Sequence, residues 1–213
     1  MIVKVCGITT AEDARAAVDA GASALGFNFW QRSPRYLNPE AAVEVLAVVP
    51  KSVWKVGVFV DETAENVAAL AKQLSLDVVQ LHGSAQGPAN LRIWRAKNVN
   101  DDFDLTQIPG GAEAFLFDAP AGERHGGTGQ SFDWTKLAGV RYKFLLAGGL
   151  DASNVGEAIQ RLHPWGVDAC SRLESAPGKK DHAKMTAFVE RALAEAKGMP
   201  RPSDAEVELH AKF

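Results

Sequence analysis

The chain has 213 residues, of which 46% are hydrophobic and 23% are charged, and its formal net charge at pH 7 is −3. These values are typical of a globular protein, and they argue against a disordered chain and against a basic nucleic-acid-binding surface. With two cysteines, Cys6 and Cys170, the chain is expected to have neither a disulfide framework nor a metal site. No apolar stretch reaches the roughly 18 residues of a membrane span, and the strand-like beginning Ile2–Cys6 lacks a signal peptide's apolar run. We expect a cytoplasmic protein without a membrane or nucleic-acid partner.

Strand-like and helix-like segments alternate along the whole chain. Runs rich in β-branched and aromatic residues predict eight strands, at 2–6, 24–29, 53–60, 77–81, 92–99, 114–118, 143–147 and 166–170. Helical patterns follow most of them, at 11–20, 39–49, 64–74, 154–162 and 183–197. Thr10 is a typical N-cap residue, and Asn38 precedes a proline at the favoured first helical position.

Eight strand–helix units predict a single-domain α/β protein, a (β/α)₈ TIM barrel. Repeated units of this kind imply parallel strands joined by right-handed crossovers. A doubly wound sheet is the alternative, but it has about five or six strands and often a glycine-rich fingerprint after the first strand. In this chain the first strand is followed by Gly7-Ile-Thr-Thr10, so the glycine-rich fingerprint is absent. The segments 82–91 and 100–111 have little helical pattern, so we expect short fourth and fifth helical connections. We expect the barrel to comprise residues 1–197, followed by a tail, 198–213.

Reactive and polar residues stand at the ends of the predicted strands. In a (β/α)₈ barrel the carboxyl ends of the strands and the loops after them form the active site. The residues at these points include Cys6, Arg35, Asp61, His82, Asp118 and Asp168. Each alone has an ordinary structural interpretation, such as a buried cysteine or a turn-forming aspartate. The barrel brings them together, which favours a site.

Two glycine-containing regions lie where this fold often binds phosphate. Gly148 and Gly149 follow the seventh predicted strand, and Ser171–Gly178 follows the eighth. Glycines allow backbone N–H groups to approach an anion. A further glycine-rich loop, Gly122–Gly129, follows Asp118, and we expect it to be a flexible segment that covers the site.

Blocks of sequence on all eight predicted units resemble the phosphoribosylanthranilate isomerase family. These blocks are Lys4–Thr9, Gly26–Tyr36, Val56–Val60, Val79–Gly83, Asp118, Gly126–Trp134, Leu146–Leu150 with Asn154-Val155, and Val167–Asp181. The family is a (β/α)₈ barrel without cofactor or metal. Its members rearrange N-(5-phosphoribosyl)anthranilate to an open-chain 1-deoxyribulose phosphate in tryptophan biosynthesis. The resemblance therefore implies an isomerase whose partner is a small phosphoribosyl substrate.

The resemblance also implies a function for individual residues. Cys6 matches the general base that removes the proton from ribose C2, and Asp118 matches the general acid that protonates the ring oxygen. Arg35 matches the residue that holds the anthranilate carboxylate, and His82 lies in an active-site block. The residues that match the phosphate-binding loops are Gly148, Gly149, Ser171 and Arg172. For such an acid–base pair, we expect the pKa of the thiol to be lowered and that of the carboxyl to be raised by burial.

The chain departs from the family where Cys170-Ser-Arg-Leu-Glu174 replaces a usual Ser-Ser-Gly-Val-Glu. If residue 172 needs a positive φ, Arg172 is strained; if not, its charge can reach the phosphate. We expect phosphate binding to be retained, and we interpret Cys170 as a packing substitution. Lys4 and Asp168 are expected to form a structural pair inside the barrel.

Two alternative functions remain open from the residues. A sister isomerase of histidine biosynthesis catalyses the same rearrangement on another phosphoribosyl amine, but it is expected to have an aspartate in place of Cys6. A non-catalytic phosphate-binding barrel would retain Gly148 and Gly149 and would need neither Cys6 nor Asp118. The sequence leaves both a monomer and a homodimer open.

Overall fold

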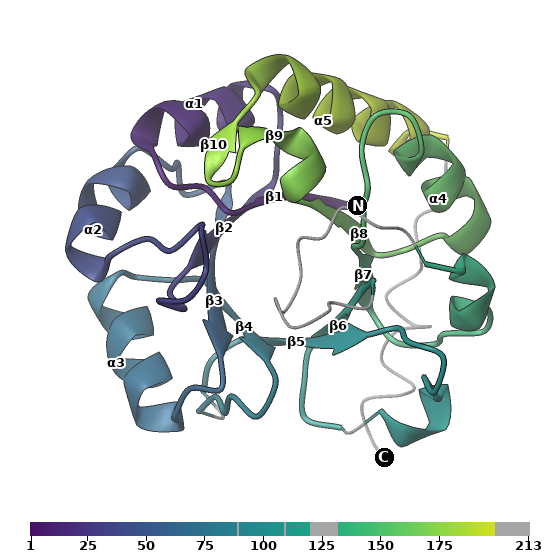
Figure 1. The fold of residues 1–213 in the computed structure, drawn as a ribbon, viewed down its shortest axis with the longest axis horizontal. Helices are drawn as coiled ribbons and strands as arrows, with labels where there is room; N and C mark the ends of the chain where they lie inside the picture. The colour runs from purple at the N-terminus through teal and green to yellow at the C-terminus, as the bar shows by residue number, and fades with distance from the viewer. Residues whose placement is uncertain (89, 109, 120–131, 199–213) are drawn as a thin grey trace.

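Eight parallel strands close into a barrel, in sequence order, in a computed structural model that describes residues 1–88, 90–108, 110–119 and 132–198 (Figure 1). The strands are β1 (Ile2–Cys6), β2 (Ala24–Asn28), β3 (Trp54–Val60), β4 (Val78–His82), β5 (Ile93–Asn98), β6 (Ala114–Asp118), β7 (Phe144–Leu146) and β8 (Gly166–Ala169). Hydrogen bonding between β1 and β8 completes the closure. The predicted (β/α)₈ fold is thus confirmed, and each strand end lies within one residue of its predicted position.

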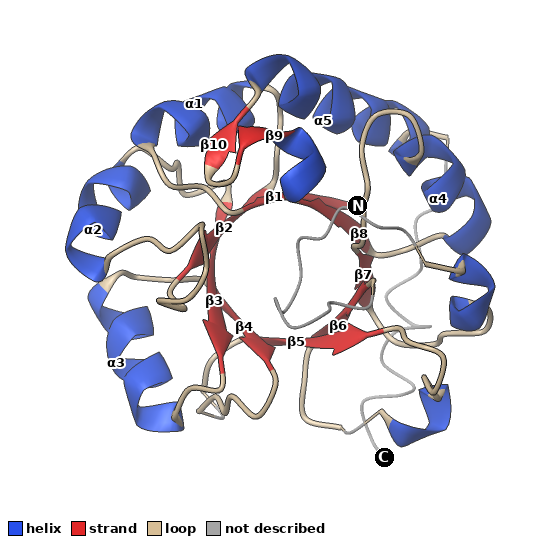
Figure 2. Ribbon diagram, in the orientation of Figure 1, coloured by secondary structure: helices blue, strands red, loops and turns tan. Residues whose placement is uncertain are grey.

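Helices surround the barrel (Figure 2). They are α1 (Ala11–Asp19), α2 (Pro39–Ala47), α3 (Ala64–Gln73), α4 (Val155–Leu162) and α5 (His182–Ala196). The Thr10 side chain accepts a hydrogen bond from the Asp13 backbone N–H at 3.1 Å, and Asn38 accepts one from Glu40 at 2.8 Å, so both predicted N-caps are present. No helix in the described part of the chain is long and apolar enough to cross a membrane.

The connections between β4 and β7 differ from the others. In the part of the chain that the structure describes, no helix lies between β4 and β5, and a single 3₁₀ helix follows each of β5 and β6. These are η1 (Leu105–Gln107) and η2 (Trp134–Leu137). After β8 comes a third, η3 (Ser171–Leu173), and then a short hairpin that the sequence analysis missed, β9 (Glu174–Ala176) with β10 (Lys179–Lys180). Both hairpin strands are too short to produce an alternating pattern. The predicted tail lies outside the described residues except for Gly198.

The barrel interior is apolar at the amino ends of the strands. Side chains of alternate residues along each strand point inward. The rings of Trp54, Trp94 and Trp165 pack together there, with centroids 5.7 to 6.0 Å apart, and Trp94 is fully buried. Arg92 lies over the ring of Trp54, with 4.5 Å between its guanidinium carbon and the ring centroid. These rings form a packed floor beneath the site.

Toward the carboxyl ends of the strands, the interior becomes polar. Lys4 is fully buried, and its Nζ lies 2.8 Å from Oδ1 of Asp168, which confirms the predicted pair. Gln80 is also buried, at 2% exposure. Burying such groups is costly unless they are paired or serve a ligand, so their grouping at one end marks this end as the candidate site.

Candidate active site

The barrel places the predicted site residues around one opening. Cys6, His82 and Asp118 are the last residues of β1, β4 and β6, and all three strands run in the same direction. Cys6 is near enough to both Asp118 and Asp168 for its charge to raise the pKa of each carboxyl. The thiol and the carboxyl that the sequence analysis paired therefore lie at the same end of the barrel, close enough to interact electrostatically.

A glycine on the neighbouring strand creates the space for Cys6. A Cβ atom at Gly26 would lie 2.7 Å from Cys6 Sγ and 3.1 Å from Lys4 Nζ, closer than side chains pack. The pKa of the Cys6 thiol is held well below its usual value, mainly by a hydrogen bond from the side chain of Cys170. Burial opposes this effect, while the charges of Lys4 and Lys180 add to it. The direction of this shift agrees with the expected one, and it favours the charged form of the Cys6 thiol.

The Asp118 carboxyl shows the opposite shift. Burial raises its pKa to about 6, although Oδ1 accepts a hydrogen bond from the Ala119 backbone N–H at 2.8 Å. The nearby Cys6 charge raises the pKa of Asp118 further, and Lys4 lowers it. Asp118 can therefore carry a proton close to neutral pH, as the sequence analysis expected.

The Lys4–Asp168 pair interacts electrostatically with both of these groups. Burial lowers the pKa of Lys4, but the charges of Asp168 and Cys6 outweigh it, so the net shift is upward and the ammonium stays charged. Burial raises the pKa of Asp168 to about 7 against the pull of Lys4. The ammonium thus supplies a fixed positive charge beneath the opening.

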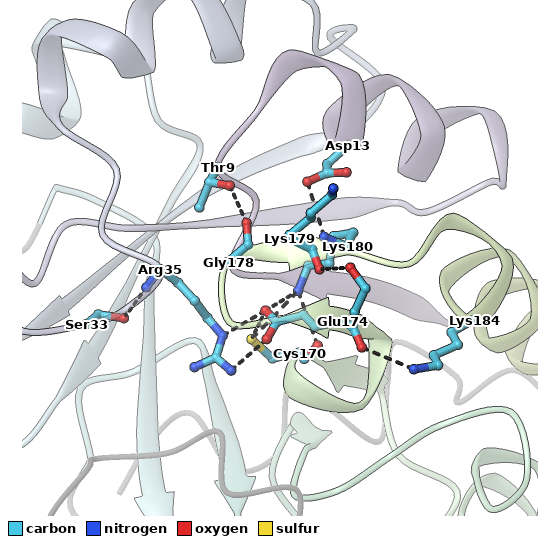
Figure 3. Close-up of polar contacts among 11 residues, drawn as sticks. Thr9, Asp13, Ser33, Arg35, Cys170, Glu174, Gly178, Lys179, Lys180 and Lys184 are labelled. Carbon is cyan, nitrogen blue, oxygen red and sulfur yellow. Dashed lines mark hydrogen bonds and ion pairs between the residues drawn. The ribbon is translucent and has the colours of Figure 1, made fainter.

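Arg35 is held by a carboxylate that the sequence analysis did not single out. Its Nε and Nη2 atoms each donate to a different oxygen of Glu174 at 2.8 Å, a bidentate pair (Figure 3). Glu174 Oε1 also accepts from Lys180 Nζ at 2.9 Å. Glu174 and Lys180 are buried, at 9% and 4% exposure. This network orients the guanidinium of Arg35. The bidentate pair with Glu174 uses Nε and Nη2 and does not involve Nη1.

His82 is fixed by a neighbour from its own strand. Its Nε2 lies 2.8 Å from Nε2 of Gln80, two residues earlier on the same face of β4. Asp61, at the end of β3, has a structural function: its Oδ1 accepts hydrogen bonds from the backbone N–H and the hydroxyl of Ser84 at 2.8 and 2.9 Å. These bonds tie the loops after β3 and β4 together.

The loops after β7 and β8 form the side predicted to bind phosphate. Gly148 and Gly149 have positive φ, +86° and +63°, and a Cβ atom at Gly148 would lie 2.6 Å from the Ala119 backbone nitrogen. Arg172 lies in η3 without a positive φ, so the strain considered for it is absent. Its Nη1 contacts Asp151 Oδ2 at 2.7 Å, and this ion pair joins the two loops.

Two further expectations concern this opening. The glycine-rich loop Gly122–Gly129 lies outside the described residues. Within the ranges that the structure describes, no group of three His, Cys, Asp or Glu side chains is arranged to hold a metal ion.

A model of the family described as N-(5'phosphoribosyl)anthranilate (PRA) isomerase matches residues 3–191. The chain belongs to this isomerase family. It is 51% identical over 199 residues to N-(5'-phosphoribosyl)anthranilate isomerase of Solibacter usitatus, an alignment that covers 91% of the chain and 98% of the relative. The function of the chain is accordingly the isomerisation of phosphoribosylanthranilate in tryptophan biosynthesis, in place of the two alternatives that the residues left open.

Solved structures of phosphoribosylanthranilate isomerases have the same fold. The crystal structure of the enzyme from Thermotoga maritima superposes with a TM-score of 0.80 at 34% identity and covers 91% of this chain and 100% of that one. A second structure, with a TM-score of 0.75 and 33% identity over the same shares, is a complex with reduced 1-(o-carboxyphenylamino)-1-deoxyribulose 5-phosphate.

Sequence reasoning missed part of what orients the isomerase site. It did not assign Glu174 and Lys180 to Arg35. Glu174 belongs to a block that resembles the family, but its partner is 139 residues away in the chain and depends on the β9–β10 hairpin. The available signal was a charged residue, Glu174, in the loop that follows the eighth predicted strand.

Proposed function

We propose that Cys6 is the general base and Asp118 the general acid of the isomerisation. The observation that carries this proposal is the pair of opposite shifts in one opening, a thiol pKa well below its usual value and a carboxyl pKa of about 6. Because the two pKa values are shifted toward each other, Cys6 is able to accept a proton and Asp118 is able to donate one near neutral pH.

The two groups would act in sequence on the sugar. Asp118 donates a proton to the ribose ring oxygen while the anthranilate nitrogen forms a double bond to C1, which breaks the C1–O bond and opens the ring. The cationic Schiff base acidifies the proton on C2. The Cys6 thiolate removes that proton, and the electron pair forms the C1–C2 double bond of an enolamine. Gain of a proton at C1 and loss of the one on the C2 hydroxyl then give the ketone.

The rest of the opening would bind the two ends of the substrate. We assign the anthranilate carboxylate to Arg35, because Glu174 fixes the plane of its guanidinium. The phosphate is assigned to the loops after β7 and β8, with Gly148, Gly149 and Ser171 offering backbone N–H groups and Arg172 offering charge. His82, fixed by Gln80, is assigned to the wall between them.

Substitution of each catalytic group tests the proposal. We expect Asp118→Asn and Cys6→Ser each to lower kcat by roughly 10² or more. Turnover is followed by the loss of anthranilate fluorescence with chemically generated phosphoribosylanthranilate. Asp104→Asn is the matched control, because Asp104 is an exposed carboxylate at the N-cap of η1 whose hydrogen bonds, to Thr106 and Gln107, are local.

Growth complementation checks the pathway. The wild-type gene should rescue a tryptophan auxotroph lacking this step but not a histidine auxotroph lacking the sister isomerase. Activity of either variant within a few-fold of the wild type would remove that residue from the mechanism.

A further inference from the structure

Two cations share one buried carboxylate beside the opening. Arg35 Nε and Lys180 Nζ both donate to Glu174 Oε1, at 2.8 and 2.9 Å, and Arg35 Nη2 donates to Oε2 (Figure 3). The side chain of Lys180 is fully buried, and those of Glu174 and Arg35 are 4% and 12% exposed. Burial raises the pKa of Glu174, but the hydrogen bonds and charges of Arg35 and Lys180 outweigh it, so the group stays ionised. The assignment of Arg35 to the anthranilate carboxylate leaves the buried ammonium of Lys180 without a function.

The guanidinium of Arg35 has two edges that can each hold a carboxylate. Nε and one N–H of Nη2 form the edge that Glu174 occupies, and Nη1 and the other N–H of Nη2 form the adjoining edge. The bonds from this side chain to the described residues do not use Nη1. Each edge matches the planar geometry of a carboxylate. The substrate carboxylate therefore fits on the Nη1–Nη2 edge, while Glu174 stays on the other.

The stem of Arg35 is held separately from its guanidinium. A Cβ atom at Gly7 would lie 2.7 Å from Arg35 Cδ, so the stem passes over the residue that follows Cys6. The backbone N–H of Arg35 donates to Ser33 Oγ at 3.1 Å. These contacts place the guanidinium near the proposed base, and Glu174 sets its rotation. A rotation of the guanidinium would move a carboxylate bound to it, and with it the sugar, relative to Cys6.

Lys180 prevents Glu174 from moving along the guanidinium. The Glu174 side chain has three rotatable bonds, and on the Nη1–Nη2 edge it would compete with the substrate carboxylate. Lys180 Nζ donates both to Glu174 Oε1 and to the Cys170 carbonyl, at 2.9 and 3.2 Å, which ties the carboxylate to the residue after β8. The backbone N–H of Lys180 donates to Asp13 Oδ2 on α1 at 3.4 Å. The ammonium is thus fixed by β8, β10 and α1 together.

We propose that Lys180 is a positioning residue that determines specificity for a substrate carboxylate: its ammonium holds Glu174 on the Nε edge of Arg35 and keeps the Nη1–Nη2 edge open. This inference rests on the proposed function of Arg35 and deepens it. Charge acts in the same direction as geometry, because two cations share the single charge of Glu174 and a second carboxylate brings the opposite sign.

Two ligands that differ only in the carboxylate test the inference. One is reduced 1-(o-carboxyphenylamino)-1-deoxyribulose 5-phosphate, the compound in the related complex, and the other is the same compound without its carboxyl group. Isothermal titration calorimetry gives the Kd of each, and the ratio of the two measures the preference for a carboxylate. Lys180 also lowers the pKa of Cys6, but both ligands meet the same Cys6, so this effect cancels in the ratio.

The variants separate the position of the charge from its presence. Lys180→Met removes the ammonium and keeps an unbranched side chain, and thermal unfolding shows whether the variant is folded. If it is not, Lys180→Gln replaces it, because an amide can still donate to the Cys170 carbonyl. Lys184→Met is the matched control. Its ammonium contacts the same hairpin, through the Glu174 backbone carbonyl at 3.1 Å, but its side chain is 54% exposed.

We expect the preference for the carboxylate ligand to fall roughly tenfold in Lys180→Met, because a charge-assisted bidentate bond is weakened. The Kd of the ligand without a carboxylate should change less than twofold. Arg35→Met, which removes the guanidinium itself, should lower the preference at least as much. Lys184→Met should keep the wild-type ratio.

Three results would overturn the inference in distinguishable ways. A preference that falls in Arg35→Met but not in Lys180→Met would remove Lys180 and leave Arg35 as the carboxylate-binding residue. An equal fall in Lys184→Met would show that net charge, and not the position of Glu174, sets the preference. A preference unchanged in Arg35→Met would show that the carboxylate binds elsewhere, and the assignment of Arg35 would fall together with that of Lys180.

Discussion

The two ends of the barrel interior are built from opposite kinds of residue. At the amino ends of the strands, Trp54, Trp94 and Trp165 pack ring against ring, and at the carboxyl ends Lys4 and Asp168 are buried as an ion pair. Apolar burial stabilises the fold, whereas burial of charge costs free energy that pairing only partly offsets. The apolar end therefore increases the free energy of unfolding, whereas the polar end, with its buried charges and shifted pKa values, decreases it. Three substitutions test this division.

The largest effect is expected at the tryptophan floor. Trp94→Ala removes a fully buried ring and should lower the free energy of unfolding by about 3–5 kcal/mol. Urea unfolding measures this loss, and kcat of the folded variant, measured well below its Tm, should stay near the wild-type value. Trp94→Phe is the matched control, since it keeps an aromatic ring and should lose less. A large fall in kcat without a loss of stability would contradict the separation of the two ends.

A gain in stability is expected at the opposite end. Burial raises the pKa of Asp118 from 3.8 to about 6, so the folded state binds this proton more tightly than the unfolded state. Stability is therefore lost as pH rises through this window, and above pH 6 the full penalty is present. Asp118→Asn removes the titration and should raise the free energy of unfolding by up to about 3 kcal/mol at pH 8.

Urea titrations at pH 4 and pH 8 check this prediction. At pH 4 the Asp118→Asn variant and the wild type should differ little, because the carboxyl is then mostly protonated in the folded protein. A variant that is equally stabilised, or destabilised, at both values would show that the buried carboxyl does not cost stability. Asp104→Asn again serves as the control, since the Asp104 carboxylate is fully exposed.

The smallest effect is expected in the loops after β7 and β8, where we propose that the substrate phosphate binds. Arg172→Ala removes the ion pair to Asp151 and the positive charge beside the proposed phosphate site. We expect KM to rise roughly tenfold, equivalent to about 1.4 kcal/mol, with kcat changed less than twofold. Steady-state kinetics and inhibition by inorganic phosphate measure it. Arg161→Ala, which breaks the exposed pair with Glu157 on α4, should change neither, and an equal effect there would point to net charge alone.

The sequence was sufficient for the barrel and for the residues at its strand ends. Alternation of strands with helices predicted the eight units, and Cys6 and Asp118 ended strands whose bounds the structure reproduces. The raised pKa of Asp118 followed from its expected burial, whereas the lowered pKa of Cys6 was expected only because a base must be charged to accept a proton. Such inferences need only the direction of each strand and the side to which a residue points.

Side-chain pairing across the barrel was less accessible. The bidentate bond between Arg35 and Glu174 depends on the β9–β10 hairpin, whose strands are too short for periodicity to reveal. Such contacts depend on side-chain rotamers and on which donors and acceptors lie nearby, and the pattern of residues along the sequence contains neither.

The turn of the β9–β10 hairpin has a consequence for protein engineering. The carbonyl oxygen of Gly178 accepts a hydrogen bond from the Thr9 hydroxyl at 2.6 Å, and a Cβ atom at Gly178 would lie 2.9 Å from the Pro34 carbonyl oxygen. Segments after three different strands thus interlock through one residue. A chimera that exchanges one of these segments between homologues would disturb its contacts with the other two, so all three should be exchanged together.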